Sequence, residues 1–163
     1  MKKIKFLIFI LFIPACQNKG TYSESKNKVA FSSRGAVSSA HPLATNAAVE
    51  ILTSGGNAMD AAIAAAFTLT VVEPTMNGLG GRTQILIFDP KTGFHGIDAT
   101  TVAPDDYDYE NAPKKKYGYP SIGIPGTVKG LVQALDGYGS LPLPEVMASA
   151  IKYAEKGHFL IEG

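Results

Sequence analysis

The chain has 163 residues, which is enough for one domain of ordinary size. Its hydrophobic content of 45% and charged content of 18% are typical of a globular protein, and its net charge of +1 argues against a dedicated nucleic-acid-binding protein, which would carry a basic stripe. Its single cysteine excludes a disulfide within the chain.

The first fifteen residues have the pattern of an export signal. Lys2, Lys3 and Lys5 precede an apolar run over residues 6–13, which is too short to span a bilayer as a helix. The following Ile-Pro-Ala-Cys is similar to a bacterial lipobox and ends at Cys16. We therefore predict a lipoprotein-type signal peptide over residues 1–15 and lipidation at Cys16, with a plain signal peptide as the alternative.

Lipidation at Cys16 would anchor the exported protein to a membrane of the bacterial cell envelope, at the periplasmic or the outer surface, because several acyl chains attach a protein stably. Residues 17–28 are rich in Ser, Asn and Lys and have little to bury. We expect residues 16–33 to form a flexible tether. Residues 34–163 then make up the globular part.

The globular part opens with a predicted strand and a predicted helix. Residues 34–40 (RGAVSSA) are small and compatible with β-structure, and we expect a buried edge or central strand there. Apolar residues at helical spacing predict a helix over about residues 42–54, with a proline in its first turn. Gly55 stands where a left-handed residue after the helix is favoured.

A second helix is predicted over residues 58–72, and its capping signals are strong. Asn57 is a good N-cap, and Asp60 stands three residues later, where its carboxylate can bond back to the cap. The helix is rich in alanine and apolar on all faces, so we expect it to be buried.

A glycine loop over residues 78–81, followed by Arg82, connects this helix to a predicted antiparallel hairpin. Residues 84–89 and 94–99 form its two strands around a turn that contains proline and glycine. Two further helices are predicted, from an N-cap at Thr127 to about residue 138 and over residues 142–156. Helices combined with an antiparallel hairpin indicate an α+β fold.

Residues 105–116 read as an exposed loop with blocks of opposite charge. Its acidic cluster lacks the glycine and the terminal glutamate of a calcium loop, and we interpret it as a solvated surface; the cluster comprises Asp105, Asp106 and Asp108. His41, His95 and His158 have no second histidine or cysteine at ligand spacing, so we expect structural or exposed roles for them. The sequence thus predicts no metal site.

The glycine loop does not have the context of a nucleotide-binding loop. A dinucleotide fingerprint needs the order strand, glycines, helix, whereas residues 58–89 give helix, glycines, strand. Whether residues 77–82 face a ligand or form a tight corner stays open at this point.

Several segments together carry a resemblance to a known family. They are residues 36–52, 55–62 (GGNAMDAA), 72–74 (VEP), 78–81 (GLGG), 124–128 (IPGTV) and 138–142 (YGSLP). In combination they resemble the N-terminal part of the large subunit of the γ-glutamyltransferase family, also called γ-glutamyl transpeptidases or glutathione hydrolases. The resemblance covers roughly residues 34–160.

The resemblance implies a fold and an activity. The fold is of the N-terminal-nucleophile hydrolase type, an αββα layered sandwich of which residues 34–163 would be an incomplete N-terminal part. Such a precursor cuts itself in two, and the new N-terminal threonine of the small subunit is the nucleophile. The enzyme transfers the γ-glutamyl group of glutathione or related amides to water or to amino acids, without a cofactor. We therefore expect the small subunit as a partner and no nucleic acid.

The chain departs from this family in two respects. It ends before the self-cleavage site, so none of its threonines is the nucleophile, and we expect this chain alone to be inactive. The family places an arginine, which grips the α-carboxylate of the γ-glutamyl group, in a D-x-R-E-x-A-P pattern. Here Thr100 stands at that position after Asp98, and a hydroxyl lacks the charged, bidentate clamp.

Arg82 stands where the family loop usually continues with glycine. We interpret Arg82 and Thr100 as candidate substrate-binding residues, with Arg82 replacing the missing arginine. The alternative is a structural Arg82 that pairs with Asp98 or caps carbonyl groups. Two other readings of the whole chain remain open: a related amide acylase with a different acyl group, and a non-catalytic surface-binding protein on the same scaffold.

Overall fold

The computed structural model describes residues 29–112 and 117–161. The predicted signal peptide, Cys16, most of the predicted tether and residues 113–116 of the charged loop lie outside the described residues. The elements along the chain are α1 (Pro42–Thr53), α2 (Ala58–Val72), β1 (Thr83–Asp89), β2 (Gly93–Ala99), a short 3-10 helix η1 (Tyr119–Ser121), α3 (Thr127–Tyr138) and α4 (Leu143–Lys156).

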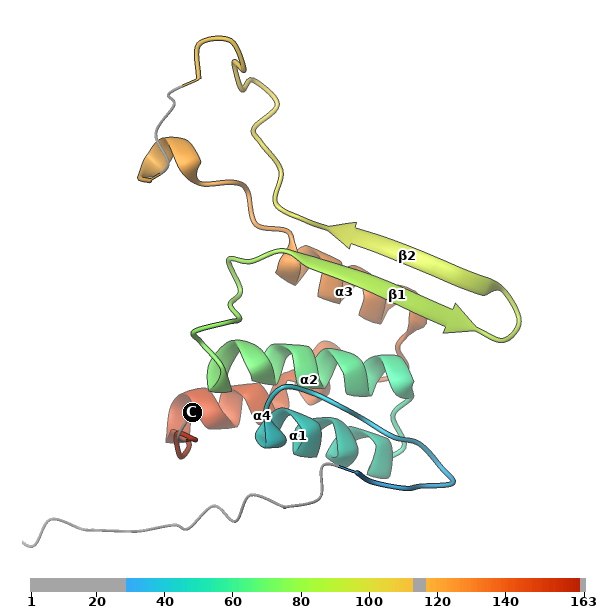
Figure 1. Cartoon of the computed structure of the whole chain (residues 1–163). Helices are drawn as coiled ribbons and strands as arrows, with labels where there is room; N and C mark the ends of the chain where they lie inside the picture. The colour runs from blue at the N-terminus through green and yellow to red at the C-terminus, as the bar shows by residue number, and fades with distance from the viewer. Residues whose placement is uncertain (1–28, 113–116, 162–163) are drawn as a thin grey trace, which may run out of the picture.

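The elements stack in layers (Figure 1). The β1–β2 hairpin lies over α3, and α2 lies between the hairpin side and the pair formed by α1 and α4. Helix α2 contacts α1, α3 and α4, so it is the central element of the described structure. The main core forms where α2, α3 and α4 meet, around Ile63, Phe67, Leu131 and Val146. Within residues 29–112 and 117–161, no helix has the combined length and apolarity that crossing a membrane requires.

Helix α1 begins at a histidine cap. His41 is extended, and its Nδ1 accepts a hydrogen bond from the Leu43 N–H at 3.1 Å. Pro42 occupies the first helical position, where a missing N–H costs nothing. The helix ends at Thr53, and Gly55 follows with a φ of 100°. The predicted left-handed residue after α1 is therefore confirmed.

Helix α2 has the predicted bounds and the predicted capping box. The Asn57 side chain accepts hydrogen bonds from the Met59 and Asp60 N–H groups at 2.8 and 3.0 Å, and the Asp60 carboxylate accepts one from the Asn57 N–H at 2.8 Å. The prediction of burial on all faces was wrong for one stripe, because Ala58 and Ala62 are exposed. The remaining faces pack against α1, α3 and α4.

The hairpin is antiparallel, as predicted, with Thr83 opposite Ala99 and Asp89 opposite Gly93. Asp89 Oδ1 accepts hydrogen bonds from the N–H groups of the turn residues Lys91 and Thr92 at 2.7 and 3.2 Å, which fixes the turn. Side chains alternate between the two faces of the hairpin. One face packs on the core through Ile85 and Ile97, and the other exposes large apolar side chains, namely Leu86, Phe88 and Phe94.

The predicted strand over residues 34–40 is absent. These residues are irregular and mostly exposed, and among the described residues they pair with no strand. A β-strand needs hydrogen-bonding partners alongside it, and β1 and β2 pair only with each other in the described structure. Small, β-compatible residues are therefore not sufficient to form a strand here.

Two predicted helix starts also need correction. The N-cap of α3 is Gly126, and Thr127 is the first helical residue, whose hydroxyl lies 3.0 Å from the Thr83 hydroxyl. Thr127 therefore makes a tertiary contact instead of a cap. Helix α4 begins at Leu143, with Pro142 as its N-cap, and ends before Gly157, as predicted.

Candidate functional site

The glycine loop docks on the start of α3. The Gly81 carbonyl oxygen accepts hydrogen bonds from the Gly126 and Thr127 N–H groups at 3.3 and 3.4 Å, and the Thr83–Thr127 hydroxyl pair lies beside them. Two glycine-containing segments more than forty positions apart in sequence are thus joined through their backbones. The loop makes a tight corner that places Arg82 and β1 next to the first turn of α3.

Helix α3 approaches the end of β2 so closely that two of its contacts require glycine. A Cβ on Gly126 would collide with the carbonyl oxygen of Ala99 and lie 2.6 Å from that of Thr100. A Cβ on Gly130 would collide with the Cβ of Ala99. Thr100 is therefore held against the first turn of α3 by backbone contact.

A cavity of about 250 Å³ lies at this junction. Its polar lining comes from the end of β2 and from α3, and includes Asp98, Thr100, Lys129 and Gln133. Asp98 Oδ1 accepts a hydrogen bond from the Thr100 N–H at 3.1 Å. This cavity is the candidate functional site, because it gathers charged and polar side chains in a small concave space.

An isolated antiparallel bridge forms another wall of the cavity. The Val102 N–H donates to the Ile124 carbonyl at 3.1 Å, and the Ile124 N–H donates to the Val102 carbonyl at 2.8 Å. Both side chains line the cavity. The bridge joins the two ends of the projecting segment between β2 and α3, which carries η1 (Figure 1).

Arg82 and Thr100 occupy facing positions just beyond the last paired residues of the hairpin. Thr83 pairs with Ala99, so one step further along both strands leads to Arg82 and Thr100. Arg82 is exposed and lies outside the residues that line the Thr100 cavity. Within residues 29–112 and 117–161 its side chain makes no ion pair or hydrogen bond, so neither the pairing with Asp98 nor the capping of carbonyl groups is present there.

The three histidines lie outside this cavity. His41 caps α1, and its ring lies 6.3 Å from that of His158 in an edge-to-face arrangement. Burial lowers the pKa of His41; the nearby Glu73 carboxylate raises that pKa, and His158 lowers it further. His95 hydrogen-bonds the Thr92 hydroxyl at 2.7 Å in the hairpin turn. These contacts give His41 and His95 structural roles.

Within the acidic cluster, Asp108 makes hydrogen bonds to neighbouring residues of its own loop. Asp108 accepts hydrogen bonds from the Asn111 side chain at 2.8 Å and from the N–H groups of Glu110 and Asn111 at 3.0 and 3.1 Å. The Asn111 side chain, followed by these backbone donors, lowers the pKa of Asp108. In the described ranges, no three or more His, Cys, Asp or Glu residues are grouped so that they could hold a metal ion.

Asp60 has a second role that sequence reasoning missed. Besides capping α2, its carboxylate accepts hydrogen bonds from the Ser140 hydroxyl at 2.6 Å, the Ser140 N–H at 2.9 Å and the Leu141 N–H at 3.2 Å. Burial raises the pKa of this fully buried carboxyl, but the hydrogen bonds from Ser140, Asn57 and Leu141 outweigh it, and the pKa is lowered. The sequence feature that could have indicated this second role is the carboxylate of Asp60 in the first turn of the apolar helix α2.

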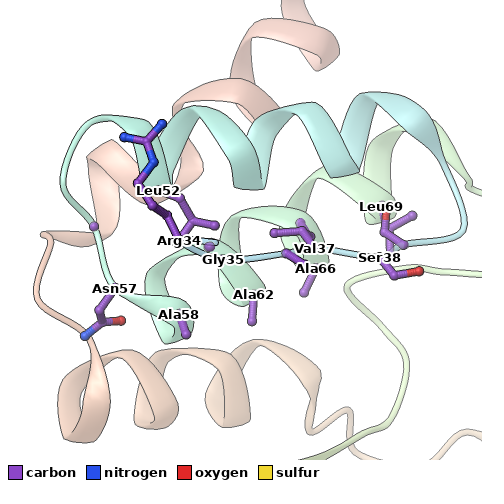
Figure 2. Close-up of a pocket in the computed structure, with 15 residues that line it drawn as sticks. Arg34, Gly35, Val37, Ser38, Leu52, Asn57, Ala58, Ala62, Ala66 and Leu69 are labelled. Carbon is purple, nitrogen blue, oxygen red and sulfur yellow. The ribbon is translucent and has the colours of Figure 1, made fainter. Parts of the chain in front are cut away.

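A larger groove of about 620 Å³ is lined by residues 34–39 and α2. Figure 2 shows the extended segment passing over the small side chains of the helix, with Asn57 near one end and Ser38 and Leu69 near the other. Alanines such as Ala62 and Ala66 form most of its helical wall, and Arg34 is its one charged lining residue. The groove is therefore suited to packing and offers little for catalysis.

The chain matches a known protein family and individual relatives within it. The family profile described as Gamma-glutamyltranspeptidase matches residues 44–162. The chain is 36% identical to a glutathione hydrolase proenzyme of Bacillus subtilis (strain 168), over 84% of this chain and 25% of the relative. It is 40% identical to the Acylase ACY 1 proenzyme of Pseudomonas sp. (strain V22), over 81% of this chain and 26% of the relative.

A solved structure of the same family has a similar fold. The crystal structure of Helicobacter pylori gamma-glutamyltranspeptidase superposes with a TM-score of 0.73 and 32% identity, over 80% of this chain and 40% of that one. The expected α+β fold of the N-terminal-nucleophile hydrolase type is thus confirmed, with its N-terminal part present here. The chain belongs to the γ-glutamyltranspeptidase family. It spans about a quarter of the length of the curated relatives it matches.

Proposed function

We propose that this chain is the N-terminal part of the large subunit of a γ-glutamyltransferase-like enzyme, which transfers the γ-glutamyl group of glutathione or related amides to water or amino acids. The observation that carries the proposal is the match of residues 44–162 to the family, supported by a relative named a glutathione hydrolase proenzyme. The whole protein would consist of this subunit and a small subunit cut from the same precursor.

In this proposal, the nucleophile is the N-terminal threonine of the small subunit. Its hydroxyl attacks the γ-carbonyl carbon and its own α-amine accepts the proton, so that an ester forms and the amine of the substrate leaves. Water or an amino acid then takes the acyl group. This chain supplies part of the binding pocket and no nucleophile, and by itself it would be inactive.

Arg82 is proposed to bind the α-carboxylate of the γ-glutamyl group. It faces Thr100 across the open end of the hairpin, so it lies one strand away from the position where the family has its arginine. Its guanidinium is exposed and makes no ion pair with a described residue, and it is therefore free to bind a carboxylate in a bidentate manner. Arg82, which directly precedes β1, would thus supply the positive charge that Thr100 lacks.

The test uses the full-length protein and a γ-glutamyl anilide. Removal of the guanidinium in Arg82→Ala should raise KM about tenfold or more, whereas Arg82→Lys, which keeps the charge and loses the fork geometry, should give an intermediate KM. Arg34→Ala is the matched control, because Arg34 is also exposed and lies in a different groove. A KM for Arg82→Ala within twofold of the unsubstituted protein would show that Arg82 does not bind the substrate carboxylate.

A second candidate function is that of an amide acylase with a different acyl group. The 40% identity to the Acylase ACY 1 proenzyme and the uncharged Thr100 favour it. The same full-length protein would then cleave amides without an α-carboxylate faster than γ-glutamyl anilides. A preference for the γ-glutamyl anilide would exclude this candidate.

Export and lipid anchoring are also proposed, on the basis of residues 1–16. In a bacterial host that processes lipoproteins, the protein should incorporate labelled fatty acid and sediment with membranes. Cys16→Ser should remove both properties. Equal labelling of the unsubstituted and substituted proteins would overturn the lipid anchor.

A further inference from the structure

We propose that Asn77 is a site of spontaneous chemical modification: its side chain cyclises onto the backbone nitrogen of Gly78, and hydrolysis leaves isoaspartate and aspartate in the corner between α2 and β1. Asparagine is among the chemically labile residues, and the sequence has one Asn-Gly pair, which lies in the loop that precedes Arg82. The proposal concerns the covalent structure of this loop, so it does not depend on which amide the enzyme cleaves.

The first observation is that nothing in the described structure restrains the Asn77 side chain. Asn77 is exposed, and its carboxamide makes no hydrogen bond within residues 29–112 and 117–161. Its backbone N–H donates to the Glu73 carbonyl at 3.0 Å, so the residue is anchored through its backbone alone. The carboxamide can therefore turn toward the nitrogen of the next residue.

The second observation concerns the nitrogen that attacks. The Gly78 N–H donates to no described residue, whereas the Gly78 carbonyl accepts the Gly81 N–H at 3.1 Å. A Cβ built on Gly78 would meet nothing within 4 Å, so the space beside its Cα is open. Glycine also gives the backbone the freedom that ring closure needs. An unpaired amide in such a position can lose its proton to base and attack the Asn77 side chain.

The other described asparagines lack this combination. Asn57 is held through both ends of its carboxamide, which accepts N–H groups of α2 and donates to the Tyr138 carbonyl at 2.8 Å. Asn111 donates to Asp108 Oδ2 at 2.8 Å, and Asn46 lies inside α1, where backbone N–H groups are used by the helix. Each of these three is followed by alanine, whose methyl group hinders ring closure.

The reaction balances with water as its one co-reactant. The deprotonated Gly78 nitrogen attacks Asn77 Cγ, and the new C–N bond forms as the bond from Cγ to the amide nitrogen breaks. The proton removed from Gly78 is returned to the leaving nitrogen, which departs as ammonia. Water then opens the five-membered imide. Cleavage at the backbone carbonyl carbon gives isoaspartate, and cleavage at Cγ gives aspartate.

Isoaspartate adds one carbon to the backbone of a corner that is fixed on both sides. Before the modified residue, the Asn77 N–H is bonded to Glu73 at the end of α2; after it, the Gly81 carbonyl accepts the Gly126 and Thr127 N–H groups at 3.3 and 3.4 Å. The extra atom lies between these anchors, and both products carry a new negative charge at neutral pH. The isoaspartyl form is therefore less stable than the original chain, whereas the aspartyl form keeps the backbone length.

The experiment ages the full-length protein in mildly alkaline buffer and follows the peptide that contains residue 77 by mass spectrometry. This peptide should gain the mass of an exchange of NH2 for OH, and protein isoaspartyl methyltransferase should label it. Gly78→Ala should slow the conversion about tenfold or more, because a side chain restricts the backbone and hinders ring closure. Gly80→Ala is the matched control: its Cβ would also meet nothing within 4 Å, and the rate should stay unchanged.

Two results would overturn the modification: an Asn77 peptide that ages no faster than the peptides with Asn57 and Asn111, or equal rates in Gly78→Ala and Gly80→Ala. Thermal denaturation tests the effect on the corner. Aged unsubstituted protein should have a lower Tm than fresh protein, whereas aged Gly78→Ala and fresh Asn77→Asp should keep theirs. Equal Tm values for aged and fresh unsubstituted protein would overturn this effect. These measurements need no catalytic activity, so their failure is distinct from failure of the proposed function.

Discussion

Asp60 Oδ2 lies 2.6 Å from the hydroxyl oxygen of Ser140, a residue 80 positions further along the chain. The same carboxylate accepts the Asn57 N–H, so it serves both the local cap of α2 and a tertiary contact to the connection between α3 and α4. The Asn57 side chain strengthens this contact by donating to the Tyr138 carbonyl at 2.8 Å. The first turn of α2 therefore fixes the position of α3, which carries one side of the candidate site.

Replacement of Asp60 by asparagine should destabilise the protein by about 2–4 kcal/mol, because charged hydrogen bonds are lost and the partly buried N–H donors of Ser140 and Leu141 are left poorly paired. Chemical denaturation would measure this change. Asp136→Asn is the control: Asp136 is exposed on α3, and its replacement should change the free energy of unfolding by less than about 0.5 kcal/mol. Equal effects of the two substitutions would contradict the role given to Asp60.

Asp60 should also make the protein sensitive to acid. Its folded-state pKa lies below the ordinary value of 3.8, so its contribution to stability is fully present above that value and is lost as the pH falls through the lower, folded-state pKa. The free energy of unfolding, measured from about pH 6 downward, should fall more steeply in the unsubstituted protein than in Asp60→Asn. Parallel curves would show that Asp60 does not titrate differently in the two states.

His41 predicts a second pH dependence at milder acidity. Burial lowers its folded-state pKa below 6.5, so between that pKa and 6.5 the unfolded state binds more protons and stability rises with pH. This contribution is complete above 6.5 and declines as the pH falls, because a protonated Nδ1 cannot accept the Leu43 N–H. His41→Asn keeps a capping acceptor without a titration, and its stability should vary less over this range. Histidine NMR titration would give the pKa directly, and a value above 6.5 would contradict the prediction.

The two glycines inside α3 should respond to alanine with opposite signs. Gly130→Ala places a methyl group against the Cβ of Ala99 and should cost about 1–3 kcal/mol, since helix and hairpin must separate. Gly137→Ala meets no atom within 4 Å and should stabilise the protein by up to about 1 kcal/mol through helix propensity. Thermal or chemical denaturation of both variants gives the comparison. Stabilisation by Gly130→Ala would show that the helix–hairpin contact is looser than the structure has it.

Local chemistry made several elements predictable from the sequence. The capping box of Asn57 and Asp60, the left-handed Gly55 and the hairpin turn depend on residues a few positions apart, and the structure has them as expected. The strand expected over residues 34–40 depends on a partner that local sequence does not specify, and it does not form among the described residues. Thr127 was expected to cap α3, but its hydroxyl lies beside that of the distant Thr83.

The candidate site was predictable only in part. Thr100 and Arg82 stood out because each departs from the family pattern, and the hairpin register places them at facing positions. Lys129 and Gln133 carried no signal of their own, since an exposed lysine or glutamine on an amphipathic helix is ordinary. Their place beside Asp98 and Thr100 follows from the contact of Gly126 and Gly130 with the end of β2, which is a tertiary feature.

The bond between Asp60 and Ser140 also sets an order of events during synthesis. The Asp60 carboxylate leaves the ribosome about 80 residues before the Ser140 hydroxyl. This carboxylate therefore stays exposed to water until the connection between α3 and α4 has been synthesised. Helix α1 and the hairpin can form before that moment from neighbouring residues. The tie between the first turn of α2 and the connection from α3 to α4 is then a late step, because it closes only after residues 140 and 141 have emerged.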